Sequence, residues 1–337
     1  MNLNNKKSNF DRSVLVIGGA GYIGSHLVLD LCDKGYDVTV FDNLSSGFEV
    51  NIDPRVDFIK GDILNDGDLA SLFKKKYLAI FHFAALKAVG DSMLDPMSYS
   101  KVNIFGTINI LNQMVANNIN FLIFSSTAAV YGKPQYLPLD EKHPLEPINY
   151  YGFTKLEMER LLKWYSSLKG INFAALRYFN AAGYDLDGRI VGLEKEPANL
   201  LPVVMETAIG LRKSISIFGN NYSTPDGTGI RDYIHVLDLV SAHKASLDYL
   251  LRNKSNIYLN LATGKGYSVL DVIKVAQSVT QKEIIYNFVD KRDGDCDQVV
   301  AKSNIAKKIL DWDPKLSDMK QIIESMWNVY SKKIDKV

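Results

Sequence analysis

A tyrosine and a lysine four residues apart are the pair in this chain best suited to do chemistry. Tyr151 and Lys155 stand at the start of a segment that the sequence predicts to be helical through Leu168. Residues four apart share one face of a helix, with Cβ atoms about 5–6 Å from each other. A phenol with a pKa of about 10 is a poor base at neutral pH, but a nearby ammonium group favours the phenolate and lowers that pKa. The pair could therefore act as a general base, although the same spacing also occurs on ordinary helix surfaces.

A glycine-rich loop gives this pair its context. The apolar run 14–17 predicts a buried parallel strand, and a helix is predicted over 25–34. Gly18, Gly21 and Gly24 lie between them. Glycines let the backbone turn tightly and approach a ligand closely, and the N–H groups at a helix N-terminus attract a diphosphate. The loop therefore predicts a dinucleotide site.

An acidic residue at the end of the next predicted strand indicates which dinucleotide binds. Strand 37–41 ends at Asp42 and Asn43. A carboxylate in this place accepts hydrogen bonds from the adenosine ribose hydroxyls and repels a 2′-phosphate. Asp42 could also cap a helix or turn, but in this context we predict NAD rather than NADP.

Composition narrows the class of protein. The 337 residues are 47% apolar and 23% charged, which is typical of a globular protein with room for two domains. A net charge of +1 gives no electrostatic case for nucleic acid or a membrane surface. The two cysteines and five histidines lack the spacing of metal ligands, so we expect no metal site. With no apolar segment suited to export or membrane insertion, we expect a cytoplasmic protein with reduced thiols.

Alternating predicted strands and helices indicate an α/β fold, a doubly wound parallel (Rossmann) sheet. The pattern loosens after about residue 180, and 185–198 reads as a long loop. We predict a dinucleotide-binding domain over 1–180, rejoined by about 232–262 through a strand at 257–261, and a smaller α/β substrate domain over 181–337. Ligands should bind beyond the carboxyl ends of the strands. The other predicted strands are 13–17, 37–41, 56–59, 78–83, 120–125 and 172–177.

Segments along most of the chain match the motifs of one family. They run from Val14 to about Trp312, with 44–54 variable, and together are similar to the extended short-chain dehydrogenase/reductase family and, within it, the UDP-galactose (UDP-glucose) 4-epimerases. The matching segments are GGAGYIGSH at 18–26, FDNLSSG at 41–47, GDI at 61–63, HFAALKAVGDS at 82–92, NIFGT at 103–107, FSSTAAVYG at 124–132, YYGFTK at 150–155, LRYFNAAG at 176–183, NLLP at 199–202 and DGTGIRDYIHVLDL at 226–239.

The resemblance implies a transient oxidation of a UDP-hexose. Tyr151 would take the proton of the sugar 4-hydroxyl while hydride passes from C4 to NAD. The 4-keto sugar would then turn over and take the hydride back on its other face. Lys155 would hold the nicotinamide ribose and, with the positive charge of the cofactor, depress the pKa of Tyr151. Thr127 would hydrogen-bond the reacting oxygen.

The resemblance also implies which residues bind the ligands, and a homodimer through helices near 98–117 and 151–168. The arginines implied for the diphosphate suit that task, because the guanidinium fork matches phosphate oxygens, although each could instead be a solvated surface charge. The residues implied for NAD are Gly18, Gly21, Tyr22, Ile23, Gly24, Asp42, Asn43, Asp62, Ile63, Phe83, Ala84, Lys87, Asn103 and Tyr178. Those implied for the UDP-sugar are Lys87, Thr127, Asn180, Asn199, Leu200, Phe218, Arg231, Tyr233, Arg292, Asp295 and Val299.

The chain departs from the family pattern at two positions. Ile17 replaces a threonine before the glycine loop, which removes one hydrogen bond but should not abolish NAD binding. Val299 stands at a pocket wall where narrowly glucose- and galactose-specific members have tyrosine. Either the wall recedes and admits N-acetylated sugars, or a neighbouring side chain fills the space.

Three other functions stay open at this point. A nucleotide-sugar 4,6-dehydratase carries an Asp-Glu pair after the threonine of the fifth strand, where this chain has Ala128 and Ala129. A net dehydrogenase, reductase or decarboxylase would form NADH during turnover. A non-catalytic NAD-binding relative would typically lack the tyrosine or the lysine, and both are present.

Overall fold

A seven-stranded parallel sheet forms the frame of the computed structural model, which describes residues 12–194, 196–292 and 294–336. The strand order β10-β6-β5-β4-β1-β2-β3 reverses between β1 and β4, the kind of switch point beside which dinucleotides bind. The predicted α/β sheet is confirmed, including the late strand that returns to its edge beside β6. The strands are β1 (Ser13–Ile17), β2 (Asp37–Asp42), β3 (Asp57–Lys60), β4 (Ala79–His82), β5 (Phe121–Thr127), β6 (Asn172–Tyr178) and β10 (Ile257–Leu261).

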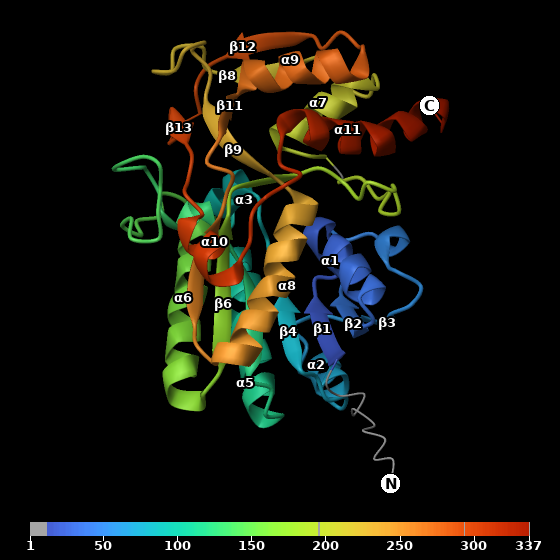
Figure 1. The fold of residues 1–337 in the computed structure, drawn as a ribbon, viewed down its shortest axis with the longest axis vertical. Coiled ribbons are helices and arrows are strands. Elements are labelled where there is room, and N and C mark those ends of the chain that lie inside the picture. Colours follow the sequence, from blue (N-terminus) through green and yellow to red (C-terminus); the bar gives the residue numbers. More distant parts are fainter. Residues whose placement is uncertain (1–11, 195, 293, 337) are drawn as a thin grey trace.

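Helices cover both faces of this sheet (Figure 1). Alternate residues of a strand point to opposite faces, so Val14 and Val16 pack in one apolar cluster while Leu15 and Ile17 pack in the other. The first cluster is closed by α1 (Tyr22–Asp33), α8 (Val236–Asn253) and α10 (Asn304–Leu310), and the second by α2 (Asp66–Leu72), α5 (Gly106–Ala116) and α6 (Tyr150–Lys169).

Helix α6, which carries the tyrosine and the lysine, has well-defined ends. The Asn149 side chain accepts a hydrogen bond from the N–H of Gly152, and Gly170 ends the helix in the left-handed conformation with φ of 75°. Before α5 the chain forms α3 (Val89–Leu94), α4 (Pro96–Tyr99) and a π-helical turn at Ser100–Phe105. The 3-10 turns are Glu49–Asn51, Ala128–Val130 and Ser331–Lys336.

A second group of elements packs beyond the carboxyl ends of the main strands, in the upper part of Figure 1. A third apolar cluster joins its helices α7, α9 and α11. Among the described residues, no helix or strand lies between 183 and 199. This agrees with the loop predicted over 185–198. The elements are β7 (Asn180–Ala182), α7 (Leu200–Ala208), β8 (Ile215–Phe218), β9 (Ile230–His235), β11 (Gly266–Ser268), α9 (Val269–Thr280), β12 (Tyr286–Val289), β13 (Gln298–Val299) and α11 (Met319–Tyr330).

The described part of the chain contains no helix that is both long enough and apolar enough to span a bilayer.

Candidate active site

A cavity of about 1050 Å³ opens between the main sheet and the second group of elements. It is large enough for a dinucleotide together with part of a second ligand, since sites for drug-sized ligands fill about 300–1,000 Å³. Every residue that we predicted for catalysis, NAD or the UDP-sugar lines this cavity except Asn103 and Val299. The cavity therefore brings together side chains that stand more than 270 positions apart, from Gly18 to Asp295.

The glycine loop forms one end of the cavity and requires glycine at two positions. Gly18 has φ of +81°, and a Cβ there would lie 2.6 Å from the backbone N of Ala84. A Cβ on Gly24 would lie 2.2 Å from the carbonyl oxygen of Gly18. Gly21 precedes α1 and supplies no side-chain cap, so the first N–H groups of the helix stay available to a ligand. A backbone this close fits a bound diphosphate.

Asp42 lies at the end of β2, on the cavity wall beside this loop. Its carboxylate accepts hydrogen bonds from the N–H of Ala20 at 3.0 Å and of Leu44 at 2.8 Å. Asp42 therefore caps the turn, as one interpretation of the sequence proposed, but it also lines the cavity. Burial raises the pKa of Asp42, and the two backbone donors oppose that rise. At the same end of the cavity, the Asn43 amide donates a hydrogen bond to the Asp62 carboxylate at 3.0 Å.

Tyr151 and Lys155 lie on one face of α6, opposite the end of β5. The Lys155 ammonium donates to the carbonyl of Ser125 at 2.8 Å and lies 5.0 Å from the ring centre of Phe124. Its distance to the ring centre of Tyr151 is 5.9 Å. The Thr127 hydroxyl lies near the Tyr151 phenol and acts to lower its pKa. The three predicted catalytic side chains thus meet at the carboxyl end of one strand.

The pKa values of this pair differ from our prediction. Burial raises the pKa of Tyr151 to about 12, and the Thr127 hydroxyl only partly opposes the rise. Burial also lowers the pKa of Lys155 to about 7, and the nearby negative charge of Glu159 only partly opposes this decrease. Lys155 alone therefore does not depress the pKa of Tyr151, because its ammonium is directed at Ser125 and Phe124 rather than at the phenol.

Two arginines lie at the other end of the cavity. Arg231, on β9, donates to Asp295 at 2.8 Å and to the carbonyls of Ile230 and Cys296, so it is not a solvated surface charge. The Arg292 guanidinium lies 3.6 Å over the ring centre of Phe218. Guanidinium groups recognise phosphate oxygens in a bidentate manner, so this end suits a diphosphate. Asp295 neutralises part of the charge of Arg231.

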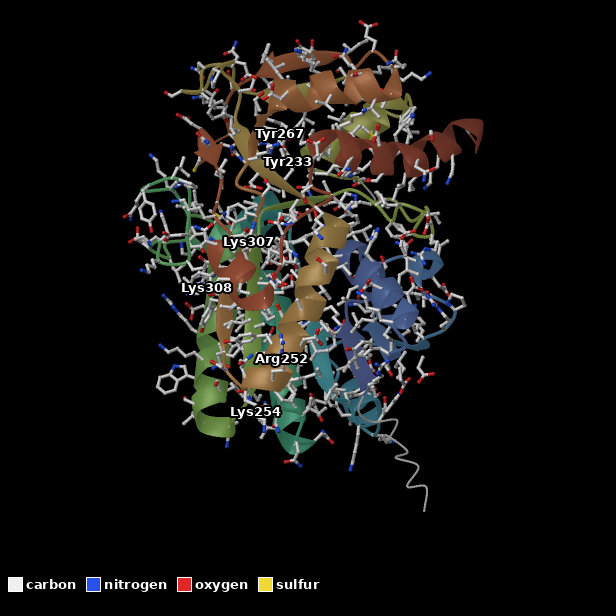
Figure 2. The ribbon with its side chains drawn as sticks, viewed as in Figure 1. Tyr233, Arg252, Lys254, Tyr267, Lys307 and Lys308 are labelled. Atoms are coloured by element: carbon white, nitrogen blue, oxygen red, sulfur yellow. The ribbon has the colours of Figure 1, made fainter. Side chains whose placement is uncertain are left out.

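The remaining predicted substrate residues surround these arginines. Asn180 donates to the carbonyl of Asp232 at 2.9 Å. Tyr233 is buried on β9, which raises the pKa of its phenol to about 12. Figure 2 shows Tyr233 on β9 where that strand connects the main body to the second group of elements. Asn199 and Leu200 form the start of α7, whose first turn faces the cavity.

Two predicted ligand-binding residues are not among those that line the cavity. Asn103 is fully buried, and its amide bonds the backbone of Leu86 and the hydroxyl of Thr154, so it ties the loop after β4 to α6 instead of lining the cavity. Val299 lies on β13, in register with Arg231, and packs on the apolar cluster around Tyr131. Neighbouring packing thus occupies the side chain of Val299, which is not on the cavity wall.

The comparisons with known proteins agree on one family. Residues 15–326 match the family model described as GDP-mannose 4,6 dehydratase. The UDP-glucose 4-epimerase of Rhizobium meliloti (strain 1021) is 41% identical over 330 residues, covering 96% of this chain and 98% of that protein. The chain belongs to the UDP-glucose 4-epimerase family, among the extended short-chain dehydrogenases/reductases. The predicted family membership is therefore confirmed.

Solved structures of this epimerase family have the same fold. The UDP-glucose 4-epimerase from Bifidobacterium longum, in complex with NAD+ and UDP, matches with a TM-score of 0.91 and 36% identity over 96% of this chain and 100% of that one. The UDP-Glc/GlcNAc 4-epimerase from Campylobacter jejuni matches with a TM-score of 0.83 and 36% identity over 95% and 99%.

The epimerase family resemblance also bears on the alternatives. Ala128 and Ala129 form the turn directly after Thr127, so the paired acids expected of a dehydratase are missing there. Among the described residues, no three His, Cys, Asp or Glu side chains gather in a way that could hold a metal ion.

Sequence reasoning missed two charged residues of the cavity, Arg212 and Glu194. Glu194, in the long loop before α7, pairs with Lys87 at 2.6 Å, and both line the cavity. A loop without periodicity gives no indication of where its side chains point. The presence of an acidic residue in a loop expected to cover two anionic ligands could have indicated that Glu194 pairs with a cation of the site.

Proposed function

We propose that this protein is an isomerase that catalyses the NAD-dependent 4-epimerisation of UDP-hexoses, with UDP-glucose and UDP-galactose as substrates. The observation that carries the proposal is the meeting of Tyr151, Lys155 and Thr127 in one cavity, between a glycine loop and two arginines. The names of the relatives support the same activity.

Each side chain has a proposed role at the reacting carbon. NAD, when bound, supplies the hydride acceptor and donor at this site. Tyr151 takes the proton of the sugar 4-hydroxyl and later returns it. Thr127 donates a hydrogen bond to the reacting oxygen, and protonated Lys155 stabilises the phenolate and binds the nicotinamide ribose.

The proposed binding roles divide between the two parts of the chain. Residues 1–180, rejoined by about 232–262, would hold NAD through the glycine loop and Asp42. Residues 181–337 would hold the UDP-sugar, mainly through Arg231 and Arg292. Lys87 serves both ligands. The other proposed NAD residues are Tyr22, Ile23, Asn43, Asp62, Ile63, Phe83, Ala84 and Tyr178, and the other UDP-sugar residues are Asn180, Asn199, Leu200, Phe218, Tyr233 and Asp295.

We include N-acetylated UDP-sugars in the proposed range. The relative from Campylobacter jejuni is named for both UDP-glucose and UDP-N-acetylglucosamine. Valine at position 299 leaves the adjoining part of the protein less filled than tyrosine would. Because Val299 packs outside the cavity, its size would affect the cavity wall only through neighbouring side chains.

We also propose a cytoplasmic homodimer. Apolar side chains exposed on the two helical segments near 98–117 and 151–168 support a dimer, since contiguous exposed apolar patches commonly mark protein interfaces. These side chains are Phe105, Phe153, Trp164 and Leu168. Two cysteines that form no disulfide support a reducing compartment.

The proposal is tested with purified protein and no added NAD. The protein is incubated with UDP-galactose and separately with UDP-N-acetylgalactosamine, and NMR is used to detect the 4-epimers. We expect both epimers and no accumulation of NADH. Net NADH formation would indicate a dehydrogenase, and an unreacted sugar with bound NAD would indicate a non-catalytic binding protein.

A further inference from the structure

A buried ion pair lies behind the catalytic side chains, outside the cavity. Glu159, on α6, and Arg177, on β6, are both almost completely buried. Arg177 donates to the two carboxylate oxygens of Glu159 at 2.9 and 2.6 Å, which is a bidentate arrangement. The Ser126 hydroxyl also donates to Glu159 at 2.5 Å. Three elements, α6, β5 and β6, are thereby joined at one carboxylate.

The third nitrogen of the Arg177 guanidinium is also hydrogen-bonded. It donates to the Tyr131 phenol at 3.1 Å, and Tyr131 donates to the side chain of Asn260 at 2.6 Å. Arg177 lies in register with Ser126 on β5 and with Asn260 on β10. A buried charge pair that is hydrogen-bonded through all three guanidinium nitrogens fixes the relative position of the strands that it joins.

Stability alone is a weak explanation for this pair. Buried ion pairs can often be replaced by apolar groups of similar volume without loss of stability, because removing two charges from water is costly. The location of the pair is more informative. Ser126 lies between Ser125, which accepts from Lys155, and Thr127, which lies near Tyr151. Glu159 lies one helical turn after Lys155, on the same face of α6.

We propose that Glu159, clamped by Arg177, is a positioning residue for the epimerase reaction that keeps Lys155 protonated and seated against Ser125. The proposal rests on the proposed function, because it acts through Lys155. Burial disfavours the charged form of a lysine, and a carboxylate one turn away favours it.

Other ionisable groups facing Lys155 do not supply this charge. His82, from β4, is neutral because burial lowers its pKa to about 3. Tyr151, on the same helix, and Tyr178, which reaches Ser125 from β6, are phenols whose pKa values burial raises. Arg177 is a cation, so its charge disfavours the Lys155 ammonium and cannot supply the stabilising charge. Glu159 is the carboxylate whose charge acts on Lys155.

The test compares Glu159→Gln with Glu159→Asp by the pH dependence of kcat and of kcat/KM for UDP-galactose. Glu159→Gln removes the charge at nearly constant shape, whereas Glu159→Asp keeps it. Loss of the charge lowers the pKa of Lys155. The decline of kcat at alkaline pH should therefore begin about one pH unit lower than in the unmutated protein. At a fixed pH on that limb, this corresponds to a kcat about tenfold lower. Glu159→Asp should retain the alkaline limb of the unmutated protein, and KM should change little in either variant.

A control on the same helix separates charge from general damage. Glu157→Gln removes an exposed carboxylate that pairs with Arg160, and its pH profile should match the unmutated protein. If Glu159→Gln does not fold, Glu159→Gln combined with Arg177→Gln leaves no lone buried charge and should shift the alkaline limb in the same direction, by less because a cation is removed with the carboxylate.

The inference is overturned if Glu159→Gln and Glu159→Asp have the same pH profile, or if the foldable charge-neutral variant retains the alkaline limb of the unmutated protein. A uniform loss of kcat at every pH would likewise assign the pair a purely structural role. These outcomes require an active unmutated protein. Absence of epimerisation in the unmutated protein contradicts the proposed function instead, so the two failures are distinguishable.

Discussion

At the scale of single residues, two opposite pKa shifts meet at Tyr151 and Lys155. Burial raises the pKa of the phenol to about 12 and lowers that of the amine to about 7. The phenolate needs donors and positive charge, which Thr127 and protonated Lys155 would provide together with the positive charge of bound NAD. The reaction should therefore slow as pH rises through the pKa of Lys155 and as pH falls through the pKa of Tyr151 in the complex.

Replacing the proposed base should affect chemistry and spare binding. Tyr151→Phe keeps the ring and removes the oxygen that moves the proton. We expect kcat to fall by on the order of 10²–10⁴, the usual contribution of a general acid–base group. Calorimetric titration should find UDP-sugar affinity nearly unchanged. Turnover close to that of the unmutated protein would remove Tyr151 from the mechanism.

Replacing the acid of the ribose site should change cofactor choice. Asp42→Ala loses the proposed charged hydrogen bonds to the ribose, so we expect NAD binding to weaken by about 1.5–3 kcal/mol, or roughly 10- to 100-fold. Asp42→Asn is the matched variant, because it keeps the shape and removes only the charge that repels a 2′-phosphate. Both should discriminate less against NADP in equilibrium binding. A preference of the unmutated protein for NADP would contradict this role.

At the scale of elements, the turn from β1 into α1 depends on close backbone contacts. A Cβ on Gly24 would lie 2.2 Å from the Gly18 carbonyl, whereas a Cβ on Gly90 meets nothing within 4 Å. We therefore expect Gly24→Ala to purify without dinucleotide, as measured by absorbance of the denatured supernatant. Gly90→Ala is the control and should purify with the same dinucleotide content as the unmutated protein. Equal NAD content in the two variants would show that the loop tolerates a side chain.

The sequence predicts the main sheet well because most of its strands are apolar runs buried on both faces, with the edge strand β3 as the exception. The edge strand β10 is recognisable for the same reason. The short strands β8, β11 and β13 carry no such run, so their pairing depends on contacts distant in sequence. The buried ion pair of Glu159 and Arg177 could not be predicted from the sequence for a related reason. A charged residue on a helix or on a strand does not indicate which residue it pairs with.

Site residues were predictable mainly through motifs. Asn103 belongs to such a motif, yet a motif does not reveal whether a side chain meets a ligand or holds a loop, and here it binds Leu86 and Thr154. Glu194 belongs to no motif, and only the fold brings it to Lys87.

At the scale of the whole molecule, the cavity exists because the second group of elements packs over the carboxyl ends of the main strands (Figure 1). One side supplies the glycine loop and the catalytic tyrosine, and the other supplies the two arginines. The Lys87–Glu194 ion pair connects the loop after β4 to the loop before α7. Both sides must be in place before a sugar can lie between the tyrosine and the cofactor.

Substrate range should depend on the bulk at position 299. An N-acetyl group must clear the wall in two orientations of the keto sugar. Tyrosine is much larger than valine, and position 299 is in register with Arg231, which lines the cavity. Val299→Tyr should therefore push neighbouring side chains toward the cavity and reduce activity on UDP-N-acetylgalactosamine more than on UDP-galactose, because the bulkier sugar needs more of that space. Equal losses in kcat/KM for both sugars would indicate damage to packing rather than a steric filter.

The central claim is that the hydride leaves sugar C4 and returns to the same carbon. The most direct measurement uses UDP-galactose deuterated at C4, incubated with the protein in ordinary water and followed by NMR. The account predicts UDP-glucose that retains deuterium at C4, with no solvent hydrogen at that position. UDP-glucose that carries solvent hydrogen at C4 would contradict it, as would complete absence of the epimer.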